Sequence, residues 1–109
     1  MIAEASGWYA VRCVLVTPRA EDETLYQERV TLWRSDSQEE AMRRAEADAE
    51  EYVTLMGDMS YSGFAQLYVL ADEPEDGAEI FALVRSSKLG TTDYLSRFFD
   101  TGDERQTLL

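Results

Sequence analysis

The sequence predicts an α+β domain whose four-stranded antiparallel sheet is built in ββαββα order with one long and one short helix. Three observations lead to this fold class. The chain has 109 residues, which is the length of one domain. Its composition, 45% apolar and 11% aromatic, is typical of a globular protein. Segments rich in β-branched and aromatic residues stand on both sides of one long amphipathic segment. The domain is expected over residues 8–102, between tails at 1–7 and 103–109.

The first two strands are expected over residues 8–16 and 25–34, separated by a polar loop that begins at Thr17-Pro18. Alternation along the first strand places one wholly apolar set toward the core: Tyr9, Val11, Cys13 and Leu15. In the second strand we expect Val30 and Leu32 inside and Arg29 and Trp33 on the opposite face.

The long helix is expected over residues 37–56. Ser37 and Glu40 have the spacing of a capping box, in which each side chain satisfies a free backbone N–H at the helix start. Glutamates 39 and 40 precede arginines 43 and 44 at the spacing that favours ion pairs. One apolar stripe has helical periodicity: Ala41, Ala45, Ala49, Tyr52 and Met56. Gly57 then ends the helix.

Two further strands are expected over residues 61–71 and 80–86, joined by the polar turn at 72–77. A short last helix begins at Thr91 or Thr92 and ends at Gly102. Its apolar positions are Tyr94, Leu95, Phe98 and Phe99. Two ββα units of this kind place both helices on one face of the sheet.

Charge and composition exclude several function classes. The chain has 22 acidic and 10 basic residues, a net charge of −12, and no histidine. Without histidine, neither a Ser-His-Asp triad nor a histidine-containing zinc site can form. The negative charge repels phosphate and argues against nucleic-acid binding. No apolar run reaches the roughly 20 residues that span a bilayer, and the first residues lack the pattern of a signal peptide.

The expected location is the cytoplasm, because a single cysteine, Cys13, fits a reducing compartment. That residue lies in the apolar set of the first strand, so we interpret it as a buried structural thiol. Nine arginines against one lysine, with abundant alanine, are typical of a bacterial source.

No motif in the sequence identifies a reaction. The glycines never cluster into a phosphate loop, and the acidic runs at 21–23 and 72–76 lack the spacing of a calcium loop. We therefore expect no catalytic residue, no cofactor and no metal site. An enzyme that works with carboxylates alone stays a weak alternative.

The informative feature is the second face of the predicted sheet, where large aromatic side chains alternate with arginines. Such residues are enriched at protein interfaces. The candidate interaction face consists of Trp8, Arg12, Arg29, Trp33, Phe64, Tyr68, Phe81 and Arg85. We expect a protein-interaction module that forms a homodimer, or binds another protein, through this face. Two other interpretations stay open: the last helix covers the face, or the face binds a small anion through Arg12, Arg29 and Arg85.

Three segments also resemble a small bacterial family known only as a domain of unknown function. They are the opening WYAVR at 8–12, the YxERVxLW pattern at 26–33 before the Glu/Ala-rich helix, and the closing RFFDTG at 97–102. The resemblance extends over most of residues 8–102. It implies a stand-alone bacterial domain and assigns no activity, cofactor or binding residue.

Overall fold

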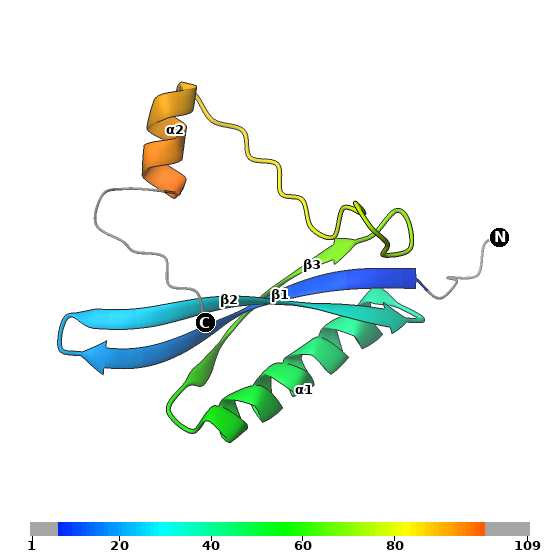
Figure 1. Cartoon of the computed structure of the whole chain (residues 1–109), viewed down its shortest axis with the longest axis horizontal. Helices are drawn as coiled ribbons and strands as arrows, with labels where there is room; N and C mark the ends of the chain where they lie inside the picture. The colour runs from blue at the N-terminus through cyan, green and yellow to red at the C-terminus, as the bar shows by residue number, and fades with distance from the viewer. Residues whose placement is uncertain (1–6, 100–109) are drawn as a thin grey trace.

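Residues 7–99 are described by a computed structural model, in which α1 lies along one face of a small antiparallel sheet (Figure 1). The elements in chain order are β1 (Gly7–Ala20), β2 (Glu23–Ser35), α1 (Gln38–Met56), β3 (Ser60–Val69) and α2 (Thr91–Phe98). The strand order is β2-β1-β3, so β1 is central and pairs antiparallel with both neighbours. Residues 1–6 of the expected first tail, and all of the expected tail at 103–109, lie outside the described range.

The prediction of a four-stranded sheet in ββαββα order is wrong. The sheet has three strands, and residues 80–86 form neither helix nor strand. The turn after β3 includes Gly77, at a φ of 84°, and does not return the chain along the edge of β3. Instead Phe81 lies against the face of the sheet, with its ring 5.9 Å from that of Tyr68. The chain is therefore held over the sheet face rather than in a ladder beside it.

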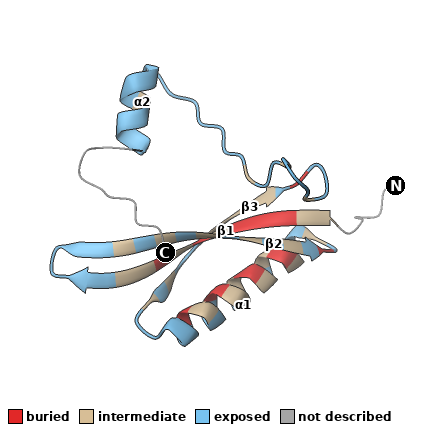
Figure 2. Cartoon of the chain, in the orientation of Figure 1, coloured by how far each residue is buried: buried red, intermediate tan, exposed pale blue. Residues whose placement is uncertain are grey.

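The core forms where α1 lies on β1 and β3. Its buried residues are Val11, Cys13, Leu15, Ala45, Ala49 and Val53. Ala41 is also fully buried, so the alanine stripe faces the sheet as predicted (Figure 2). The stripe continues to Val53 rather than to Met56, which is 52% exposed. Small side chains on this stripe let the helix backbone lie close to the central strand.

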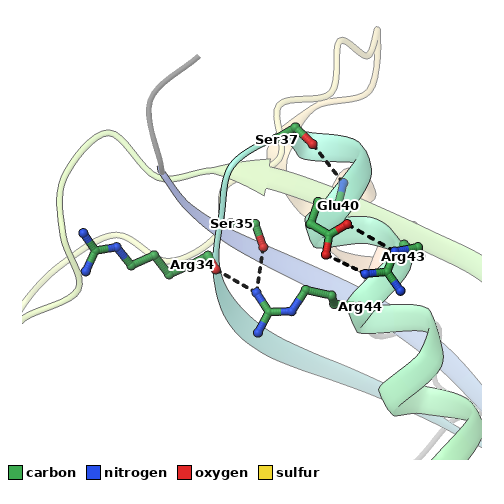
Figure 3. A network of polar contacts seen from close by, with 6 residues as sticks. All are labelled: Arg34, Ser35, Ser37, Glu40, Arg43 and Arg44. Atoms are coloured by element: carbon green, nitrogen blue, oxygen red, sulfur yellow. Dashed lines mark hydrogen bonds and ion pairs between the residues drawn. The ribbon is translucent and has the colours of Figure 1, made fainter. Parts of the chain in front are cut away.

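The start of α1 keeps the predicted cap but only half of the capping box (Figure 3). The Glu40 backbone N–H donates to Ser37 Oγ over 3.1 Å. The Glu40 carboxylate binds Arg43 instead, which donates from both Nε and Nη2. Arg44 donates to the Arg34 carbonyl oxygen and to Ser35 Oγ, which ties the first turns of α1 to the end of β2. At the other end, Gly57 has a φ of 86° and donates to the Val53 carbonyl.

The two faces of β2 are the reverse of those predicted. Antiparallel pairing sets Thr31 opposite Val11 and Trp33 opposite Tyr9, and residues directly opposite share a face. Arg29 and Trp33 therefore face α1, whereas Val30 and Leu32 lie on the other side, about 40% exposed. β2 is an edge strand and lies beyond the alanine stripe of α1. Polar side chains that contact the side of the helix therefore take the place of an apolar core there.

Helix α2 has the predicted place in the chain but packs against none of the other described elements (Figure 1). Its N-cap is Gly90, without a side-chain cap from Thr91 or Thr92. Gly102, the predicted end, lies outside the described residues, and the helix ends at Phe98. α2 does not share a face of the sheet with α1.

Candidate functional site

We call the sheet face opposite α1 the open face. Strand pairing places three groups of side chains there: Trp8, Ala10, Arg12 and Val14 of β1, Glu28, Val30 and Leu32 of β2, and Gln66 and Tyr68 of β3. Phe64 lies in the stretch of β3 where the register shifts, and alternation from Ala65 assigns its side chain to the same face. Four of the predicted interface residues are among them: Trp8, Arg12, Phe64 and Tyr68. Phe81 joins them from the segment after β3.

Arg12 is the polar centre of the open face. Its cross-strand neighbours are Val30 on β2 and Gln66 on β3. The guanidinium forms an ion pair with Glu28, with 3.2 Å between Nη1 and Oε1, and donates from Nη2 to Gln66 Oε1. It also lies over the Phe81 ring, 4.8 Å from the centroid. These contacts hold the guanidinium on the open face, with Glu28 as its ion-pair partner.

The segment after β3 covers part of this face. Leu70 is buried and donates its backbone N–H to the Trp8 carbonyl. Farther along, Tyr68 donates its hydroxyl to Glu79, and Phe81 contacts both Tyr68 and Arg12. The covered part of the open face is therefore the part around Phe81.

Away from Phe81, the open face has three exposed apolar side chains. Val30 is 41% exposed, Leu32 39% and Phe64 51%. Beside them, Trp8 Nε1 and Arg12 Nε are buried and have no hydrogen-bond partner among the described residues. A buried donor without a partner costs about 1–3 kcal/mol. The face thus combines exposed apolar area with unused donors.

The structure places the other three predicted interface residues elsewhere. Arg29 faces α1, forms a 2.5 Å ion pair with Asp48 and lies over the Tyr52 ring. Trp33 lies under the Arg44 guanidinium, 5.0 Å away, and donates from Nε1 to Thr31 Oγ1. Arg85 lies in the segment before α2. Sequence reasoning missed Val30 and Leu32 because their apolar character assigned them to the core.

The three arginines of the alternative anion site are not brought together, because Arg12 lies on the open face, Arg29 on the helix face and Arg85 in the segment before α2. A cavity of about 370 Å³ lies between the β1–β2 hairpin and the end of α1. Its lining includes Arg19, Tyr26, Tyr52 and Asp58 but none of those three arginines.

The core holds one group of titratable side chains. Burial raises the pKa of the Cys13 thiol. Tyr61 donates to Glu46 over 2.5 Å, and its pKa is raised by desolvation and by this carboxylate. Both groups are therefore held protonated, which is the opposite of what a nucleophile needs. In the described part of the chain, no three residues of metal-binding type come together as a site.

Comparison with known proteins identifies a family but assigns no activity. The family model described as Domain of unknown function (DUF4288) matches residues 8–82. The RFFDTG segment lies beyond that range. No curated protein and no solved structure matches the chain. Within residues 7–99, neither helix has the length and apolar character needed to cross a membrane.

Proposed function

Because the chain belongs to the family described as Domain of unknown function (DUF4288), with no activity to inherit, we propose from the open face alone that it is a non-enzymatic protein-interaction module that forms a homodimer. The observation that carries the proposal is the uncovered apolar part of the open face around Arg12. Exposed apolar side chains on one sheet face, here Val30, Leu32 and Phe64, are of the kind that protein interfaces bury.

A second copy of the chain is the occupant that the face fits best. The open face contains its own polar centre, apolar neighbours and two unused donors, Trp8 Nε1 and Arg12 Nε. In a dimer with two-fold symmetry, each copy can cover the open face of the other. A central arginine surrounded by aromatic and aliphatic side chains also has the composition of an interface hot spot.

The test is the variant Leu32→Asp, studied by analytical ultracentrifugation at micromolar concentrations. The wild type is expected to be a dimer. The variant is expected to be a folded monomer, because the substitution buries a charge in the contact while Leu32 makes no part of the core under α1. A wild type that is monomeric at high micromolar concentration, or a variant that stays dimeric, contradicts the proposal.

A further inference from the structure

The segment at residues 82–99, which we call the arm, has a helix that packs on none of the other helices and strands in the described part of the chain. α2 has eight residues and packs on none of the other described elements. Isolated helices shorter than about 12–15 residues are marginal in water and owe their stability to packing of an apolar face. Such a face exists here, with Leu95 50%, Phe98 44% and Phe99 57% exposed. The helix therefore requires a surface that lies outside the described part of its own chain.

The arm is nevertheless organised internally. Arg85 Nη1 donates to the Tyr94 hydroxyl over 3.3 Å, and its guanidinium lies over the Phe98 ring, 4.9 Å from the centroid. The Tyr94 ring lies 4.8 Å from that of Phe98. Arg85 thus holds α2 against the segment that leads to it, in a position away from the strands (Figure 1). In this arrangement the apolar face of α2 does not pack on the sheet of the same chain.

Residues 82–99 differ in charge from the domain that precedes them. Residues 82–99 hold three basic residues and one acidic one, a net charge of +2. Residues 7–81 hold six basic and 17 acidic residues, a net charge of −11. The match to the domain family ends at residue 82, where the arm begins. Residues 100–109 add three acidic residues and one basic one, so the end of the chain from residue 82 onward is neutral overall and lacks the strong negative charge of the preceding domain.

We propose that the arm of each copy packs α2 onto the open face of the other, so that two exchanged arms close the dimer. This inference rests on the proposed homodimer and names the segment that makes the contact. The apolar face of α2 meets the uncovered residues of the open face, Val30, Leu32 and Phe64. Phe81, held by Arg12 and Tyr68, anchors the arm at its own sheet.

The area available matches what a stable dimer needs. Seven large apolar side chains between residues 80 and 99 are 39–93% exposed: Ile80, Leu83, Val84, Leu89, Leu95, Phe98 and Phe99. At roughly 150–200 Å² for a large side chain, they present on the order of 600 Å² per chain. Standard interfaces bury about 800 Å² per partner, and the open face supplies further apolar area.

The experiment compares three variants of the full chain by analytical ultracentrifugation. Phe98→Asp places a charge in the apolar face of α2 and is expected to weaken dimerisation by roughly 100-fold or more. Ser96→Asp adds the same charge away from that face and is expected to leave dimerisation unchanged. Leu95→Asp provides a second test of the same surface. Circular dichroism and thermal unfolding check that each variant keeps the wild-type fold.

Mixing then separates arm exchange from direct contact between sheets. The Leu32→Asp chain keeps an intact arm, and the Phe98→Asp chain keeps an intact open face. A 1:1 mixture is therefore expected to form a heterodimer at concentrations at which neither variant dimerises alone. A dimeric Phe98→Asp protein, or the absence of this heterodimer, overturns the arm exchange while the homodimer stands. A dimeric Leu32→Asp protein overturns the proposed homodimer itself.

Discussion

At the residue scale, two consecutive side chains of β2 have opposite roles. Leu32 lies on the open face, whereas Trp33 lies between Arg44 and Thr31 on the helix face. The sequence predicts the opposite faces for the two residues. Aliphatic residues were expected in the core, and a tryptophan beside arginines was expected at an interface. The pairing of β2 with β1 determines which face each side chain occupies, and this pairing joins residues that are distant along the chain.

This assignment of faces yields a prediction for each residue. Trp33→Ala removes the contact with Arg44 and opens a void under the start of α1, so the free energy of unfolding is expected to fall by about 2 kcal/mol. Leu32→Ala is expected to change it by less than about 1 kcal/mol and to weaken dimerisation instead. Urea unfolding at a protein concentration too low for dimerisation measures the first effect, and sedimentation at higher concentration measures the second. Equal losses of folding stability would contradict the assignment of faces.

A pH prediction follows from the two protonated groups in the core. The pKa values of Cys13 and Tyr61 are raised in the folded state, so the unfolded chain loses these protons first as pH rises. The native state then binds more protons, and the free energy of unfolding is expected to fall above about pH 9. Urea unfolding at successive pH values measures the decline. Cys13→Ala and Tyr61→Phe are expected to make it shallower, and an unchanged slope in the double variant would refute this origin.

At the element scale, α1 was predictable because its signals are local. The Ser37 cap and the alanine spacing depend on residues within one helix, and the structure confirms both. The segment at 80–86 has strand composition, but its fate depends on distant Arg12 and Tyr68, which hold Phe81 on the open face. Local patterns carried no information on that capture, so a fourth strand was predicted where none forms. Three of the eight candidate interface residues, Arg29, Trp33 and Arg85, also lie elsewhere than on the open face.

Two alanines of α1 give a matched test of how closely the helix lies on the sheet. Ala45 is 1% exposed in the core, whereas Ala47 lies on the solvent side. Ala45→Leu is expected to lower the free energy of unfolding by about 1–3 kcal/mol, since the added atoms have no room against β1. Ala47→Leu adds the same atoms in solvent and is expected to have almost no effect. Similar results for the two variants would show that the helix does not pack as described.

At the scale of the whole molecule, the net charge of −12 acts on stability. Several helix acids do have partners, because Asp48 pairs with Arg29 and Glu46 accepts from Tyr61. The remaining excess of negative charges is still mutually repulsive, and salt screens this repulsion. The Tm is expected to rise by roughly 2–5 °C between about 20 and about 200 mM NaCl. The measurement uses the Leu32→Asp variant, so that salt effects on dimerisation do not enter, and a falling Tm would contradict the argument.

The strand order also determines which backbone groups stay unpaired while the chain is being synthesised. β1 is the central strand and is made first, but 49 residues separate its end at Ala20 from the end of β3 at Val69. At about 5–20 residues per second, the second edge of β1 waits roughly 2–10 s for its partner during synthesis. The β1–β2 hairpin and α1 can assemble in that interval, with backbone N–H and C=O groups of β1 still unpaired along one edge. A nascent chain halted after α1 is therefore expected to be a substrate for chaperones, and one released after β3 is not.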